Sequence, residues 1–318
     1  MFIREMDYIT YPVSRKAFKA KACVDWLDIA IRISRPTQFQ HLQDCFEKAG
    51  CGKLHVKAVE ERAGGVSEIF VIRIHDELAN DYATLSAKLN KVAKDYPIIG
   101  EPTIAAIEIA CDFWHKGPPA LFIRDTFAMT YRLQASIYAS GVKPRQFDPE
   151  LGERGEVRFM DSEGARLNPN GTFYIGNETD GLMWKAYFKS VDKKKSLPQS
   201  KWRARVEVTI QGADLQSFGI HNLSSLSGFK FDRLSRLFRF RRPVDPIALA
   251  DGDLYKLTAI QANRRVNDAT PARGIHSFDS IGRKSHRWRN KLRAESKHIE
   301  PDYELQDAVK GALKRLSI

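Results

Sequence analysis

Two segments of the sequence carry charged residues at alternate positions between apolar ones. In AAIEIACDFW, Glu108 and Asp112 are four residues apart, and in WRARVEVTI, Arg205 and Glu207 are two residues apart. Alternate residues of a β-strand lie on one face, so each segment gathers its charges on a single face. Glu108 and Asp112 would lie about 13 Å apart along one strand. Either could therefore bind a metal ion only together with a carboxylate from a neighbouring strand.

A third segment, MWKAYFKSV, adds a hydroxyl group and two amines to the candidate chemistry. Lys185, Tyr187 and Lys189 alternate and would share one strand face. A half-exposed strand shows the same alternation without any catalytic role. Taken together, the three segments offer carboxylates for a hard divalent cation, cations for a phosphate and a hydroxyl nucleophile. That combination suits cleavage of a phosphodiester.

The first third of the chain contains the elements that would position these residues. Its apolar pattern switches between strand and helix periodicity. It predicts strands at 25–33, 53–59, 68–75 and 103–113 and helices at 37–49 and 81–94. The order β-α-β-β-α-β is that of a ferredoxin-like unit. We therefore predict an α+β protein with an antiparallel sheet.

The rest of the chain is predicted to add a second set of strands and then a basic region. A helix is expected at 121–138, hairpins and loops at 144–170, strands at 172–176, 183–191 and 202–211, and a final helix at 302–316. We expect a catalytic domain at 1–225, whose sheet-forming halves lie at about 20–115 and 120–215. A basic helical or tail region that binds DNA would follow at 226–318.

Composition and missing motifs exclude several classes of protein. The chain of 318 residues is 43% hydrophobic and 28% charged, which is typical of a globular protein. It has no apolar run long enough for a membrane span and no apolar signal segment at its start, so we expect a soluble cytoplasmic protein without a membrane partner. The four cysteines form no CxxC pair and are interpreted as reduced core thiols. Phosphate-loop, GxSxG, HExxH and His-apolar-His motifs are absent.

Positive charge is concentrated near the end of the chain. The net charge is +12, and residues 229–298 hold 17 basic and 7 acidic residues, a local excess of ten. Such a field favours a polyanion, and the stretch 271–298 adds aromatic side chains that could stack on bases. A solvated surface is the alternative interpretation. The candidate DNA-binding residues of this stretch are Arg283, Lys284, Arg287, Trp288, Arg289, Lys291 and Arg293.

An ordered set of short motifs resembles a known family. VDWLDIAI, AAIEIACDFW, TFYIGNETDGLMWKAYFKSVD and WRARVEVTI follow one another between residues 24 and 211. They resemble the motifs of the rolling-circle replication initiation factors, which are plasmid and phage initiators of the replication-transfer type. Relaxases of some integrative elements are their kin.

The resemblance implies roles for particular residues. Tyr187 matches the tyrosine of the tyrosine-x-lysine strand and would be the nucleophile, with Tyr174 as the alternative. Arg205 and Lys189 would hold the phosphate, and Lys185 would contact DNA. The acidic positions imply that a divalent metal, Mg²⁺ or Mn²⁺, is bound by Glu108, Asp112 and Glu207.

The function implied by the resemblance is initiation of rolling-circle replication. A metal-dependent nickase would cut one strand at an origin, give a 5′-phosphotyrosine and a free 3′ hydroxyl, and rejoin the strands at termination. The expected partners are double- and single-stranded origin DNA, a host helicase and polymerase, and a second copy of the chain. The alternatives are a relaxase for conjugative transfer and a non-catalytic nucleic-acid-binding protein.

Overall fold

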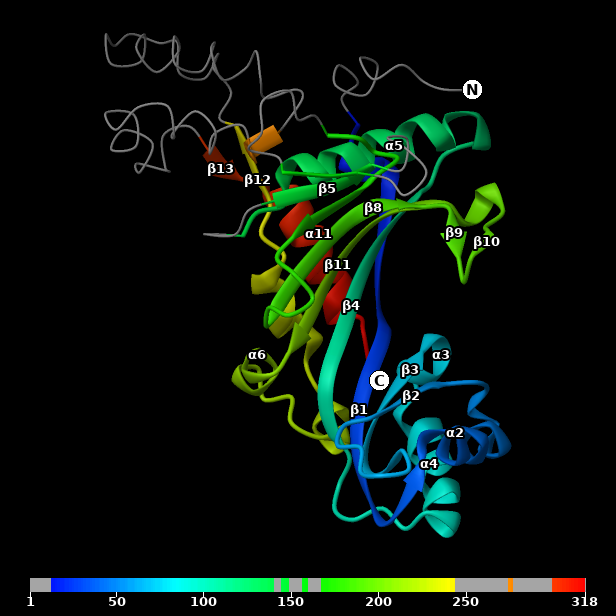
Figure 1. Ribbon diagram of the computed structural model, residues 1–318. Helices are drawn as coiled ribbons and strands as arrows, with labels where there is room; N and C mark the ends of the chain where they lie inside the picture. Colours follow the sequence, from blue (N-terminus) through cyan, green and yellow to red (C-terminus); the bar gives the residue numbers. More distant parts are fainter. Residues whose placement is uncertain are drawn as a thin grey trace, which may run out of the picture.

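One large antiparallel sheet organises the molecule. The computed structural model describes residues 13–139, 144–148, 156–159, 167–243, 274–276 and 299–317. Within these residues, nine strands form a sheet of order β2-β3-β1-β4-β11-β8-β7-β5-β6 (Figure 1). Every neighbouring pair is antiparallel. The predicted α+β class with an antiparallel sheet is confirmed.

The first four strands are connected through helices, and one short helix lies among them that the sequence did not predict. The strands are β1 (Phe18–Gln38), β2 (His55–Ala58), β3 (Val66–His75) and β4 (Thr103–His115), and the helices are α2 (Phe39–Phe46), α3 (Asp76–Ala79) and α4 (Tyr82–Asp95). The side chain of Asp81 caps α4 by accepting from the backbone N–H of Thr84. β1 is much longer than the predicted strand at 25–33, because alternate apolar residues continue before that range from Phe18 to Val24 and the strand runs on through polar residues to Gln38.

The second half extends the same sheet. Its elements are α5 (Pro119–Ser136), β5 (Pro144–Asp148), β6 (Glu156–Phe159), β7 (Thr172–Ile175), β8 (Leu182–Lys189), β11 (Arg203–Gln211) and α6 (Ala213–Ser217). A small hairpin of β9 (Val191–Asp192) and β10 (Lys195–Ser196) follows β8. β11 pairs with both β4 and β8 and therefore joins the two halves.

Helices cover the apolar face of the central strands. On β11, Val206, Val208 and Ile210 are fully buried, and α5 packs against β11, β8 and β4. The last helix, α11 (Tyr303–Lys314), packs against β1 and buries Leu305 and Leu313 among others. These side chains belong to one continuous apolar core that also includes the residues under α2 and α4. The opposite face of the central strands is polar.

The described parts of the C-terminal third pack into the same core. They comprise the short helices η4 (Leu223–Leu226), η5 (Phe231–Leu237) and η7 (Gly274–His276), the strands β12 (Arg241–Pro243) and β13 (Ile299–Pro301), and α11. η5 contacts α11, and β12 pairs with β13. The remaining 3₁₀ helices are η1 (Arg15–Ala17) and η3 (Gln199–Lys201), and a π-helical turn, η2 (Glu47–Cys51), extends α2. No helix in the described part of the chain is long and apolar enough to cross a membrane.

Candidate functional site

The register of three central strands builds a polar row across the sheet. β11 is flanked by β4 and β8, so that Arg205 lies between Asp112 and Tyr187. In the next row, Glu207 lies opposite Lys185. Because all these residues alternate with buried apolar ones, their side chains share the face that the helices leave uncovered. The prediction that the polar residues within each of the three segments share a strand face agrees with this register.

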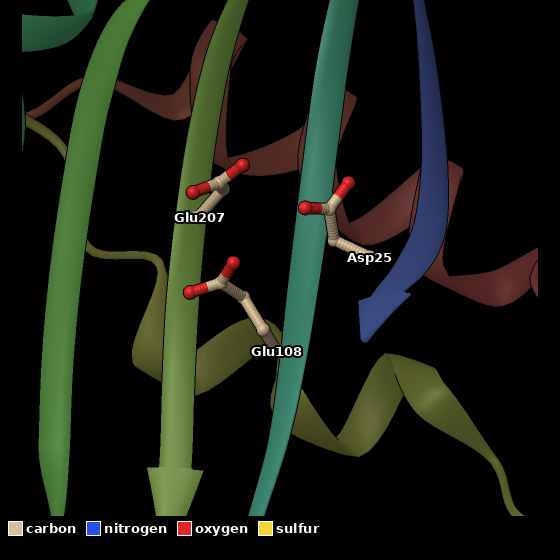
Figure 2. Close-up of side chains that lie close together, drawn as sticks. All are labelled: Asp25, Glu108 and Glu207. Carbon is tan, nitrogen blue, oxygen red and sulfur yellow. The ribbon is translucent and has the colours of Figure 1, made fainter. Parts of the chain in front are cut away.

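A β-bulge in β1 adds a carboxylate to this face. The pairing of β1 with β4 shifts between Val24 and Trp26, which leaves Asp25 as the extra residue. A bulge redirects the side chains of its strand, and here Asp25 is brought towards Glu108 and Glu207 (Figure 2). One oxygen from each of these three carboxylates lies within 4.8 Å of the others. We call Asp25, Glu108 and Glu207 the acidic cluster.

Glu108 is held by three donors from three strands. The indole Nε1 of Trp26 donates to its Oε1 at 2.7 Å, and the Thr209 hydroxyl donates to its Oε2 at 2.6 Å. The ammonium of Lys185 lies 2.7 Å from the same Oε2. Glu108 is only 1% exposed, and these bonds compensate the cost of burying a carboxylate. Its position is therefore fixed from several directions.

Arg205 is the centre of a buried ion-pair network. Its guanidinium makes a bidentate contact with Asp112 at 2.5 and 2.8 Å, and it contacts Asp25 at 2.5 Å and Glu207 at 3.2 Å. Arg203 adds a second cation 3.0 Å from Asp112. Arg205 is 2% exposed, and each of its three guanidinium nitrogens donates to a carboxylate of the protein. In this arrangement it orients carboxylates.

The Tyr187 hydroxyl donates a hydrogen bond to Oε1 of Glu207 at 2.7 Å. Burial and the neighbouring Glu108 carboxylate raise the pKa of Glu207 to about 7. Burial, together with the adjacent Glu207, also raises the pKa of Tyr187 well above its usual value. Tyr187 therefore keeps its proton in the resting site, and Glu207 is the acceptor to which that proton points.

Two lysines of β8 border the acidic cluster. Lys185 lies 2.7 Å from Glu108 and 3.5 Å from Glu207. Burial lowers its pKa, but Glu207 and Glu108 together raise it above the usual value, so the side chain is cationic. Lys189 lies 3.8 Å from Asp25 and 3.0 Å from Asp192. For Asp25, burial raises the pKa, but Arg205 and Lys189 lower it below its usual value.

The structure brings together most of the residues predicted from the sequence. Glu108, Glu207, Tyr187, Lys185 and Arg205 form direct contacts, and Lys189 lies at their edge through its contact with the cluster. Tyr174 lies opposite Lys185 on β7 and has the guanidinium of Arg145 5.0 Å from its ring centre. The predicted DNA-binding residues Arg283, Lys284, Arg287, Trp288, Arg289, Lys291 and Arg293 lie outside the described residues.

The carboxylates differ from the predicted ligand set in one position. Asp112 is engaged by Arg203 and Arg205 and is not part of the acidic cluster, whereas Asp25 is. Sequence analysis missed Asp25 because a bulge breaks the alternation on which it relied. A signal was present, since the buried apolar residues of β1 are even-numbered from Phe18 to Val24 and odd-numbered from Leu27 to Ile33.

The acidic cluster has the donor chemistry of a divalent-cation site. Carboxylate oxygens are the ligands that Mg²⁺ and Mn²⁺ prefer, and within the described part of the chain the three oxygens converge from β1, β4 and β11. The residues present therefore fit such an ion. The resting network already supplies cations to the same carboxylates through Lys185, Lys189 and Arg205.

Comparisons with known proteins add little to this geometry. No model of a protein family matches the chain, and no curated protein sequence matches it. Among solved structures, the chain is similar to the rolling circle replication initiator protein from Geobacillus stearothermophilus, with a TM-score of 0.38 and 12% sequence identity. The similarity covers 76% of this chain and 96% of that chain. At this level of similarity, the chemistry of the site has to be inferred from its own residues.

Proposed function

We propose that the protein is a DNA nickase that uses Tyr187 as its nucleophile and initiates rolling-circle replication. The observation that carries this proposal is the hydrogen bond from the Tyr187 hydroxyl to Glu207 inside a cluster of three carboxylates. A nucleophilic hydroxyl, a carboxylate acceptor and nearby cations are the parts that a phosphodiester transfer requires. The sequence motifs that resemble those of replication initiators support the same chemistry.

Tyr187 and Glu207 would perform the first proton transfer. The tyrosine oxygen forms a bond to phosphorus as its proton passes to Glu207, the bond from phosphorus to the 3′ oxygen breaks, and the leaving 3′ oxygen takes up a proton from solvent. The products are a 5′-phosphotyrosine and a strand with a free 3′ hydroxyl. Because the phosphotyrosine ester keeps the energy of the cleaved bond, attack by a 3′ hydroxyl reverses the step and rejoins the strands. The hydrogen bond from Tyr187 places Glu207 to take the proton and to return it when the step is reversed.

The other residues would position the reacting groups. A divalent cation, Mg²⁺ or Mn²⁺, held by Asp25, Glu108 and Glu207 would supply a Lewis acid for the phosphoryl oxygens. Lys185 and Lys189 border the cluster and would contact phosphate. Arg205 fixes Asp25 and Glu207 in place, and a direct contact with phosphate would require it to exchange one of its carboxylate partners.

A nickase of this kind would act on DNA together with other proteins. The substrate would be origin DNA, first as a duplex and then as a single strand, and a host helicase and polymerase would use the nicked product. We also propose that the chain binds a second copy of itself as a homodimer. The order β4-β1-β3-β2 with antiparallel pairs supports a ferredoxin-like unit in the first half. The basic stretch of the C-terminal region would add affinity for phosphates.

A second candidate, a non-catalytic nucleic-acid-binding protein, is favoured by one observation. Each carboxylate of the acidic cluster already has a cationic partner, as a purely structural network would. Relaxase activity would use the same active site as replication and differs only in the DNA that is transferred.

Covalent capture of DNA distinguishes a nickase from a binding protein. Single-stranded circular DNA is incubated with the full chain and Mn²⁺, and protein–DNA adducts are separated under denaturing conditions. We expect an adduct whose digestion yields a phosphorylated peptide containing Tyr187. An adduct on Tyr174 would identify Tyr174 as the nucleophile in place of Tyr187. Binding of DNA without any adduct would favour the second candidate.

A further inference from the structure

Lys185 bridges the two glutamates of the acidic cluster, whereas Arg205 bridges Asp25 and Glu207. Its ammonium lies between Oε2 of Glu108 and Oε2 of Glu207, at 2.7 and 3.5 Å. The other oxygens of these carboxylates already accept from Trp26, Tyr187 and Arg205. Oε2 of Glu108 also accepts from the Thr209 hydroxyl, and Lys185 is the cation that contacts both Oε2 atoms, so a metal ion bound through them would share these oxygens with the ammonium.

The ammonium and a divalent cation compete for the same oxygens. A divalent ion needs its carboxylate oxygens at about 2.1 Å, which would place it within van der Waals distance of an ammonium that contacts the same two atoms. Repulsion between the two charges at that separation is large in a buried site. One cation therefore has to leave before the other can bind.

We propose that Lys185 is a built-in counter-ion that holds the acidic cluster closed to metal until DNA phosphate draws it away. This inference rests on the proposed metal-dependent function. The side chain of Lys185 is 22% exposed, whereas those of Glu108 and Glu207 are 2% exposed. The lysine can therefore move outward while the carboxylates stay in place. Its strand neighbour Tyr187 lies on the same face, so a phosphate placed for attack would also attract the ammonium.

Metal binding and DNA binding are coupled as a consequence. Phosphate offers Lys185 a new partner and frees the carboxylate oxygens for the ion, and the ion in turn leaves Lys185 free for phosphate. By linkage, each ligand increases the affinity for the other by the same factor. The resting protein is thereby a weak metal binder, which limits cleavage chemistry before DNA is in place.

Mn²⁺ affinity, measured by titration calorimetry on the full chain, tests the proposal without any cleavage step. Lys185→Met keeps the length of the side chain and removes its charge, and we expect Mn²⁺ to bind at least about tenfold more tightly. Lys189→Met is the matched control, because it removes a lysine charge from the same face of the same strand. The ammonium of Lys189 lies 3.8 Å from Asp25 and does not lie between the two Oε2 atoms. The effect of this control should not exceed about fivefold.

A second titration, with DNA present, tests the coupling between metal binding and DNA binding. Both proteins carry Tyr187→Phe, which prevents cleavage, and a short oligonucleotide of arbitrary sequence is added. We expect it to increase the affinity for Mn²⁺ by about tenfold when Lys185 is present and hardly at all in Lys185→Met. Lys185→Arg keeps the charge and controls for a change in Mn²⁺ affinity that is caused by altered folding. It should bind Mn²⁺ no more tightly than the parent chain.

The outcomes separate this inference from the proposed function. Equal Mn²⁺ affinity with and without the Lys185 charge overturns the inference, even if the covalent adduct on Tyr187 is found. Absence of Mn²⁺ binding in every variant, with or without oligonucleotide, overturns both the inference and the metal dependence of the proposed function.

Discussion

The two faces of β11 are buried to nearly the same degree by opposite means. Val206, Val208 and Ile210 are fully buried under helices, and Arg205 and Glu207, between them in sequence, are each 2% exposed on the other face. The first group is stabilised by removal of apolar surface from water. The second is buried only because each charge is matched by another. The apolar face should therefore tolerate small losses of volume, whereas the polar face should tolerate the loss of a charge poorly.

The largest effect is expected from Tyr187→Phe, which should separate chemistry from folding. Loss of the hydroxyl removes the proposed nucleophile, so adduct formation should fall below detection, by at least about 10⁴-fold. DNA affinity should change little, because the ring and its packing remain. Gel-shift and adduct assays on one preparation measure both. Tyr174→Phe is the control and should still form the adduct.

Arg205→Met should be the most destabilising single change on the polar face. It leaves Asp112 and its neighbours buried with fewer cations, and breaking a buried ion pair costs about 3–5 kcal/mol. Urea unfolding gives the change in free energy of unfolding. Adding Asp112→Asn should recover part of the loss, since one uncompensated charge is then removed. A double variant no more stable than the single one would show that the loss comes from packing.

The pH dependence of stability should carry the signature of Glu207. Its folded-state pKa of about 7 exceeds the usual glutamate pKa of about 4.5, so the folded protein binds more protons between these values. Stability from this group is therefore present below about pH 4.5 and is lost as pH rises to about 7, by about 3 kcal/mol. Urea unfolding at several pH values should show this slope in the parent chain and a flatter one in Glu207→Gln.

His276 on the apolar face should give the opposite slope. Burial lowers its pKa to about 4, although a hydrogen bond to the Gln134 carbonyl acts against this, and its ring packs against Phe173. The unfolded chain then binds the proton more tightly, so stability is present above about pH 6.5 and is lost as pH falls towards 4. His276→Asn should remove this loss and leave the slope caused by Glu207. An unchanged acid profile would show that His276 is hydrated.

The smallest effect is expected from Ile210→Val. It deletes one methylene group from the apolar face of β11, next to the charged face altered by Arg205→Met. Such substitutions cost about 1 kcal/mol. The two variants, measured under one set of unfolding conditions, give the difference between the faces directly. A loss as large as that of Arg205→Met would mean that both faces are equally intolerant.

Local patterns were sufficient to predict much of the fold but not the full site. Regular alternation predicted that Glu108, Glu207, Lys185 and Tyr187 lie on polar strand faces, because period two is a local property of an extended chain. The order of the strands depends on contacts distant in sequence, which no local pattern contains. Asp25 was missed because its position depends on a bulge, and the pairing of Asp112 with Arg205 depends on register between strands.

The bulge at Asp25 also makes β1 a strand with two reading frames. Before it, Phe18, Ala20, Ala22 and Val24 are buried, and after it Leu27, Ile29, Ile31 and Ile33 are buried. Deleting Asp25 would bring the two frames into phase, so a regular strand would keep both apolar sets on one face but would lose a carboxylate of the acidic cluster. In a lineage of such proteins, the bulge would therefore be retained for the carboxylate that it supplies and not for the burial of the strand.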